Sequence, residues 1–144
     1  SKTPLKNIER ANYIIKPSHD LGSSLGFDKN RADDLIKLGY FDAFRAVKGL
    51  RGEEYYIMPL DEEESLKYIY RLLKDKINES ENKLARTIFE DYAPKLAEDL
   101  EMSENFRYDE LLYKLLEKEG NRKKIDRFRV YTVEEFMREI ENVN

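Results

Sequence analysis

The chain has 144 residues and a formal net charge of −4; hydrophobic residues make up 40% of it and charged residues 39%, which excludes disorder along its whole length. It has no cysteine, which excludes a disulfide framework and a thiolate zinc site and is compatible with the reducing cytoplasm where we expect the protein to act. Its apolar runs are far shorter than the roughly 20 residues that cross a bilayer, so we expect no transmembrane segment.

The first predicted elements are a strand, a loop and a helix. The opening residues are polar and lack a methionine, so we interpret the chain as a piece of a longer protein or as one carrying a tag remnant. β-branched and aromatic residues predict a strand at 11–16, which Pro17 ends. A helix is predicted from about Asp28 to Gly49. Its apolar residues recur at a spacing of three and four and should face a partner surface: Ala32, Leu35, Ile36, Gly39, Tyr40, Ala43, Phe44 and Val47.

A change of composition near Pro59 predicts a domain boundary. Residues 1–59 carry 10 Lys/Arg and 8 Asp/Glu, a net charge of +2, whereas residues 60–144 carry 16 and 22, a net charge of −6. We expect a strand-loop-helix segment at 1–59, with a further short strand at 55–58, and a helical domain at 60–144. The acidic second half argues against nucleic acid as a partner, because phosphate binding depends on clustered Lys and Arg.

The second half begins with two predicted helices. Asp61 and Glu64 form the capping signature of the first, which has an apolar stripe behind it. The second runs from about Glu81 to Leu100 and contains Pro94. Because a proline removes one intrahelical hydrogen bond and clashes with the preceding turn, it predicts a kink or a break into two shorter helices.

The chain ends with a helix, a strand and another helix. Gly120 is the predicted stop of the first of these helices, whose apolar face is Tyr108, Leu111, Leu112, Leu115 and Leu116. Residues 128–131 alternate like a strand, and Thr132 with Glu135 is a capping box that opens the last helix. The fold class is therefore α+β, mostly α, with two or three short strands and about five helices.

One motif resembles a catalytic element. The residues at 22–26 read G-x-S-x-G between a strand and a helix, the pattern of a nucleophile elbow, and would make Ser24 the nucleophile. An elbow requires the serine directly after the strand and the helix immediately after the serine. Here residues 17–21 separate the strand from the first glycine, and the helix starts after the second. We therefore interpret Ser24 as a loop residue and assign no residue as catalytic.

Three other polar groups have ordinary structural explanations. His19 and Asp20 are adjacent, and in an extended segment they point to opposite sides. The carboxylates at 61–64 would suit Ca²⁺ or Mg²⁺, but the helix dipole explains acidic residues in a first turn. We predict no metal and no cofactor. A basic cluster with interleaved aromatic residues would suit anionic lipid headgroups or nucleic acid, although a solvated loop is the simpler interpretation: Arg122, Lys123, Lys124, Arg127, Phe128, Arg129 and Tyr131.

The segments ANYIIKP and FDKNRADDLIKLGYFDAF resemble the C-terminal part of the catalytic domain of patatin-like phospholipases. Bacterial members have a strand of the form A-D-x-x-I-x-P, a loop, and a helix reading roughly F-x-x-A-D-E-L-I-x-x-G-Y. The resemblance covers about a quarter of the chain, and residues 60–144 have no counterpart in it. The matching residues are Ala11, Ile15 and Pro17 in the strand, and Phe27, Ala32, Asp33, Leu35, Ile36, Gly39 and Tyr40 in the helix.

The resemblance implies a parent enzyme that hydrolyses lipid acyl esters with a Ser-Asp dyad on a three-layer α/β fold. In that family the serine lies in a G-x-S-x-G elbow and the aspartate in a D-G-[GA] motif, both earlier in the chain than the matching segment. No D-G-[GA] occurs here, and Ser24 does not lie at the family's elbow. We carry over no catalytic residue and expect this chain to be non-catalytic alone.

We therefore expect the C-terminal fragment of a patatin-like lipid acyl hydrolase, comprising the end of its α/β domain and a helical extension. Its partners would be the rest of the parent chain and, at the membrane periphery, the parent's lipid substrate. The open edge of the strand at 12–16 would pair with the strand near Val130 or with a second copy in a homodimer. Two alternatives stay open: a stand-alone helical protein-interaction or regulatory module, and a small serine hydrolase that uses Ser24.

Overall fold

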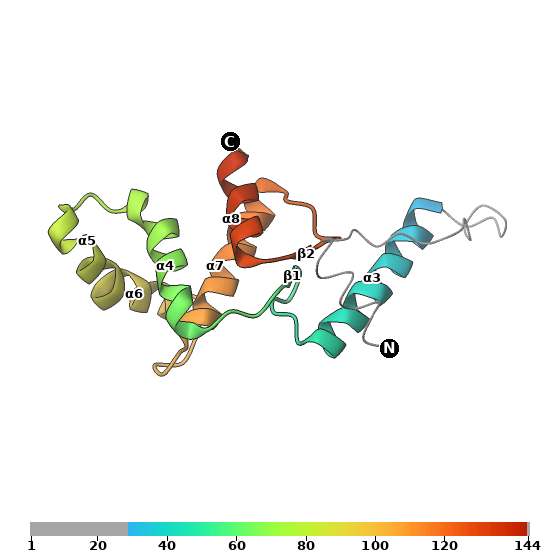
Figure 1. The fold of residues 1–144 in the computed structure, drawn as a ribbon, viewed down its shortest axis with the longest axis horizontal. Helices are drawn as coiled ribbons and strands as arrows, with labels where there is room; N and C mark the ends of the chain where they lie inside the picture. Colours follow the sequence, from blue (N-terminus) through green and yellow to red (C-terminus); the bar gives the residue numbers. More distant parts are fainter. Residues whose placement is uncertain (1–28, 144) are drawn as a thin grey trace. The chain divides into compact units, whose positions relative to one another are not determined.

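The computed structural model describes residues 29–143 and shows the expected mostly α-helical α+β fold (Figure 1). The strand expected at 11–16 and the loop that holds His19, Asp20 and Ser24 lie outside the described residues. The described chain divides into two compact units, one made of residues 29–59 and 119–143 and the other of Leu60–Lys118. Residues 119–143 thus belong with the first unit, although the whole helical half follows residue 59 in sequence.

The first unit is built around a small parallel sheet. Tyr56 lies opposite Val130 and Ile57 opposite Tyr131, within the two segments predicted as strands at 55–58 and 128–131. Residues 12–16 lie outside the described residues, so their expected pairing with the strand near Val130 stays a prediction. Within the described residues the strand at Val130 pairs with the strand at Tyr56. The elements of this unit are α3 (Lys29–Lys48), β1 (Tyr56–Ile57), the end of α7 (Tyr108–Lys123), β2 (Val130–Tyr131) and α8 (Val133–Asn142).

The first helix, α3, is held on this sheet by Phe41, whose side chain is fully buried. The centroid of its ring lies 5.0 Å from that of Tyr56 and 5.9 Å from that of Phe128. One turn further along, the Arg45 guanidinium lies 4.4 Å from the Tyr56 ring centroid and donates a hydrogen bond to the Tyr55 carbonyl oxygen. Because truncating a buried aromatic side chain costs about 3–5 kcal/mol, Phe41 is the main anchor of α3.

The face of α3 that the sequence predicts to be covered is largely exposed. Of its residues, Phe44 packs beside the Phe41 cluster, whereas Leu35, Tyr40 and Val47 are 60%, 49% and 65% exposed. The physical reason is that α3 carries apolar residues on two sides. Phe41 lies opposite the predicted face and finds aromatic partners on the sheet, which fixes the rotation of the helix.

The second unit is helical, and its chain order is α4 (Glu62–Leu73), the 3₁₀ turn η1 (Lys74–Lys76), α5 (Glu81–Thr87), the π-helical turn η2 (Ile88–Tyr92), α6 (Ala93–Asp99) and the first part of α7. The break predicted at Pro94 is confirmed, because α5 and α6 are separate helices joined by η2. Pro94 lies in the first turn of α6, which follows η2 directly, and its missing N–H cannot donate to the preceding turn. Buried side chains from these helices form the core: Ile69, Leu73, Leu84, Ile88, Ala97, Leu111, Leu112 and Leu116.

The two predicted helix caps differ in the structure. At α8 the capping box is confirmed, since Thr132 Oγ1 accepts from the Glu135 N–H at 3.1 Å and Glu135 Oε1 accepts from the Thr132 N–H at 2.8 Å. At α4, Asp61 occupies the cap position, but its side chain makes no capping hydrogen bond. There the carbonyl oxygen of Asp61 accepts from the Ser65 hydroxyl at 2.8 Å instead.

The prediction that Gly120 stops a helix is wrong, because α7 continues to Lys123. The helix ends at Lys124, whose φ of 57° is left-handed, and the Ile125 N–H donates back to the Gly120 carbonyl oxygen at 2.9 Å. Gly120 is needed for packing: a Cβ built on it would lie 2.6 Å from Cζ of Phe136 and 3.2 Å from a ring carbon of Tyr55.

This packing predicts opposite effects for two glycine-to-alanine substitutions in helices. Alanine is favoured over glycine by roughly 1 kcal/mol in a helix, so Gly39→Ala, where a Cβ meets nothing within 4 Å, should raise the free energy of unfolding. Gly120→Ala should lower it by about 1–2 kcal/mol, because overpacking outweighs propensity. Urea denaturation of both variants measures the difference. A stabilised Gly120→Ala would contradict the close packing of Phe136.

Candidate functional site

None of the residues considered for hydrolase chemistry lies in the described part of the chain. Ser24, His19 and Asp20 all precede residue 29. Among the described residues, no group of three or more His, Cys, Asp or Glu side chains is placed to hold a metal ion.

The acidic run at 61–64 has structural contacts. The Glu62 carboxylate accepts from the Tyr108 backbone N–H at 2.9 Å, at the start of α7. It also lies 3.9 Å from the Arg107 guanidinium, which binds Asp109 at 3.1 Å. Since a carboxylate satisfies a free amide at a helix N-terminus, Glu62 tethers α4 to the start of α7.

The basic cluster is engaged within the fold. Arg122 pairs with Glu119 at 2.8 Å. Lys123 donates to the carbonyl oxygens of Ile140 and Val143, at 2.5 and 2.7 Å, and so caps the C-terminal end of α8. Arg129 lies 3.8 Å from Glu135 and against the ring of Tyr131. Arg122 and Lys123 therefore lie in α7 and not in a loop, and three of the five basic side chains have partners within the fold. The paired side chains are those of Arg122, Lys123 and Arg129.

Buried tyrosines of the first unit also have structural partners. The Tyr55 hydroxyl donates to the Ile125 carbonyl oxygen at 2.8 Å, and the Tyr131 hydroxyl donates to that of Asp126. Burial, with a smaller contribution from the nearby Asp126 carboxylate, raises the pKa of Tyr131 far above its ordinary value. Tyr131 thus stays neutral near pH 7 and holds the loop before β2.

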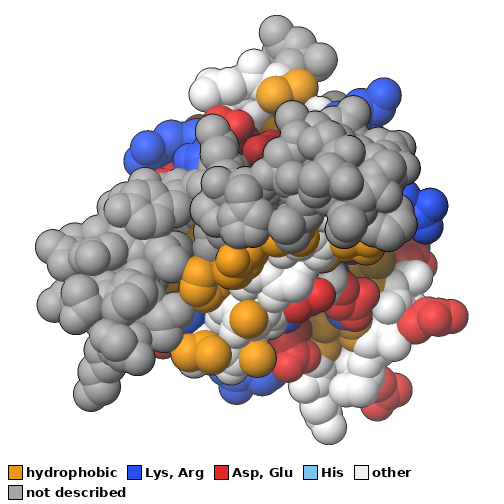
Figure 2. Space-filling model, turned by 90° about the vertical axis from the view of Figure 1, so that its right-hand side faces the viewer, with side chains coloured by type: hydrophobic (Ala, Val, Ile, Leu, Met, Phe, Trp, Pro, Cys, Tyr) orange, Lys and Arg blue, Asp and Glu red, His pale blue; other side chains and the backbone are white. Residues whose placement is uncertain are grey.

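The feature that remains without a structural explanation is the outward face of α3, which we call the α3 apolar face. Between Ala32 and Val47, at 100° per residue, eight residues without a charge fill a continuous arc of the helix, flanked by Asp33 and Asp42. They are Ala32, Leu35, Ile36, Gly39, Tyr40, Ala43, Ala46 and Val47. Figure 2 shows hydrophobic side chains reaching the surface among acidic and basic ones.

The shape of the α3 apolar face suits close packing against another apolar surface. Its middle is made of small residues, and nothing lies within 4 Å of a Cβ built on Gly39. Leu35, Tyr40 and Val47 supply the bulk around this shallow centre. A helix with small central residues lets a partner's backbone or side chains approach closely, and each large side chain buried would contribute about 1.5–3 kcal/mol. The exposed residues of this face could therefore be covered by a partner surface.

Sequence reasoning identified most of this face and the need for a partner surface, but it missed Phe41. The signal for Phe41 was its position on the opposite side of the helix from the apolar repeat, together with the aromatic residues at 55–56 and at 128 that can receive it.

Within residues 29–143, no helix combines the length and the apolar character needed to cross a membrane. Comparison with family models, with curated proteins and with solved structures gave no match.

The exposed and buried sides of α3 predict different costs of substitution in this chain. Leu35→Glu should change the free energy of unfolding by less than about 0.5 kcal/mol, because the side chain is at the surface. Phe41→Ala should lower it by about 3–5 kcal/mol. Thermal or urea unfolding of both variants distinguishes them, and an equal loss in the two would mean that the α3 apolar face is covered.

Ser24 gives a second prediction. A fluorophosphonate probe, which reacts with activated serines, should label the purified chain no more than it labels a heat-denatured control, because the spacing around Ser24 is wrong for an elbow. Gel fluorescence of the wild-type chain and of Ser24→Ala measures this. Labelling that is lost in Ser24→Ala would identify Ser24 as a nucleophile.

Proposed function

We propose that this chain is a non-catalytic C-terminal part of a patatin-like lipid acyl hydrolase, in which the α3 apolar face packs against the rest of the parent's α/β domain. The observation that carries the proposal is the exposure of that face, with Leu35 and Val47 at 60% and 65%. In α/β proteins, helices cover a sheet through one apolar face. A helix cut away from its sheet would leave such a face uncovered.

Five of the ten residues that resemble the family belong to this face. Ala32, Leu35, Ile36, Gly39 and Tyr40 belong both to the motif and to the α3 apolar face, and Leu35, Gly39 and Tyr40 are exposed. The exposed residues of the motif are not covered by residues 29–143. This supports the proposal that another part of the parent protein covers them. Phe41 and Arg45, which hold α3 on the small sheet, lie outside the motif's matched positions.

The role of this part would be structural. The chain contains no D-G-[GA] motif, and the only G-x-S-x-G lies between the matching strand and the matching helix. We propose that the parent supplies the serine and the aspartate, acts in the cytoplasm, and meets its lipid substrate at the membrane surface. The chain would complete the hydrolase domain through α3 and add the helical unit Leu60–Lys118.

The coding sequence upstream of Ser1 tests the proposal first. It should encode a strand followed by a G-x-S-x-G elbow and, later, a D-G-[GA] motif, and the longer protein should hydrolyse p-nitrophenyl butyrate where this chain does not. An upstream region with neither motif would overturn the proposal and leave the stand-alone interaction module.

A matched pair of substitutions in the longer protein tests the role of α3. Val47→Glu should lower its melting temperature by several degrees, because it would bury a charge against the α/β domain. Val143→Glu, which changes an exposed valine outside α3, should leave the melting temperature of the longer protein unchanged. Equal melting temperatures for the two variants would show that α3 does not pack on the parent domain.

A further inference from the structure

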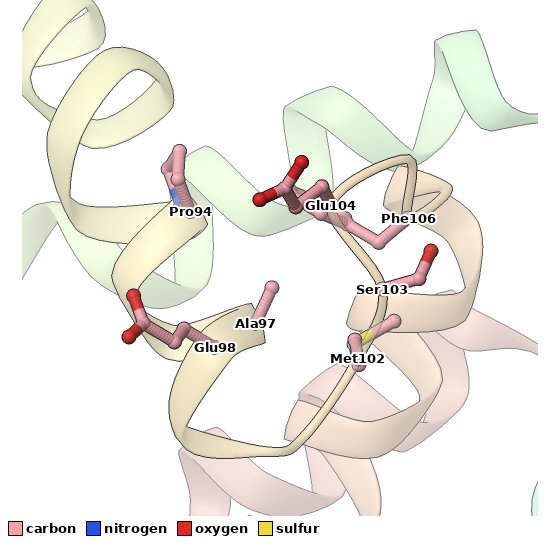
Figure 3. Close-up of a pocket in the computed structure, with 7 residues that line it drawn as sticks. All are labelled: Pro94, Ala97, Glu98, Met102, Ser103, Glu104 and Phe106. Atoms are coloured by element: carbon pink, nitrogen blue, oxygen red, sulfur yellow. The ribbon is translucent and has the colours of Figure 1, made fainter.

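The second unit contains a pocket that the proposed function does not use. It lies between α6 and the loop that follows it and has a volume of about 410 Å³ (Figure 3). This is within the roughly 300–1,000 Å³ of ordinary ligand pockets and is large enough for a leucine or phenylalanine side chain. Four lining residues are apolar: Pro94, Ala97, Met102 and Phe106.

The walls of the pocket are held by hydrogen bonds and ring contacts. The Met102 N–H donates to the Ala97 carbonyl oxygen at 2.9 Å, which joins the loop to the end of α6. The Phe106 N–H donates to the Ser103 carbonyl oxygen at 3.1 Å, and the Phe106 ring packs edge-on to Tyr108 at a centroid distance of 5.1 Å. A pocket whose walls are already fixed loses little entropy when a ligand binds.

The charge around the pocket has one sign. Glu98 and Glu104 line it, and none of the lining residues is basic. In Figure 3 the Glu104 side chain extends from the loop toward the Pro94 end of α6. Residues 90–104 carry six exposed acidic side chains and a single basic one, Lys95, and the unit Leu60–Lys118 carries 16 Asp/Glu against 10 Lys/Arg, a net charge of −6.

We propose that this pocket binds a short basic peptide segment of a partner protein. One apolar side chain of the segment enters the cavity over Ala97 and Met102, and a flanking Lys or Arg side chain lies beside Glu104. An apolar floor with an acidic rim selects this combination, because a neutral apolar ligand gains nothing from the rim and a polar cation gains nothing from the floor.

Fluorescence anisotropy with a labelled hexapeptide, Lys-Lys-Leu-Phe-Lys-Lys, tests this on the whole chain at about 0.15 M salt, where long-range attraction is largely screened. Glu104→Lys should weaken binding at least about fivefold. Glu79→Lys makes the same charge change at an exposed residue outside the pocket and should alter the affinity less than about twofold.

The apolar contact is tested separately. Replacing Leu-Phe by Ser-Ser in the peptide should abolish binding to the unchanged chain. Ala97→Leu, which fills the cavity, should abolish binding of the Leu-Phe peptide, provided that the variant keeps the melting temperature of the unchanged chain.

Equal weakening by Glu104→Lys and Glu79→Lys, or equal binding of the Ser-Ser peptide, would overturn the proposal, because either result means attraction to the acidic unit without the pocket. Absence of binding up to about 1 mM peptide would also overturn it. Concentration-dependent dimers that Glu104→Lys abolishes, seen by analytical ultracentrifugation, would assign the pocket to a second copy of the chain instead.

Discussion

The contact on which the first unit depends is the burial of Phe41 against Tyr56 and Phe128. It joins α3, near the start of the described chain, to β1 and to the segment just before β2, and the Arg45 guanidinium over the Tyr56 ring reinforces it. The contact also fixes the rotation of α3 about its axis. Because Phe41 points inward, the arc centred on Gly39 and Ala43 points outward. The contact on one side of the helix thus determines which residues are exposed on the other side.

Local sequence signals predicted those features that are decided locally. The capping box of Thr132 and Glu135 needs only two side chains of one turn, and the break at Pro94 follows from one missing N–H. The two short strands were found at 55–58 and 128–131 by their aromatic and β-branched residues. Their parallel pairing with each other was not, since it joins residues more than seventy positions apart.

Features decided by distant partners were missed. The low helix propensity of glycine suggests that a helix ends at Gly120. In the structure Gly120 lies inside α7, where the Phe136 ring of α8 packs closely against it. The two apolar sides of α3 are equally plausible cores in the sequence, and only the position of Tyr56 and Phe128 selects one. The pocket over Ala97 was invisible for the same reason, because it exists only where the loop after α6 folds back. The interpretation of Ser24 stays a prediction.

The exposure of the α3 apolar face can be tested directly, because the sequence contains no cysteine. Single substitutions Leu35→Cys and Val47→Cys, with Ile69→Cys as a fully buried reference, can be followed by their rates of reaction with a thiol reagent. We expect the two α3 thiols to react nearly as fast in the folded chain as in denaturant, and the Ile69→Cys thiol to be strongly protected. Protection of both α3 thiols to the level of that reference would contradict the account.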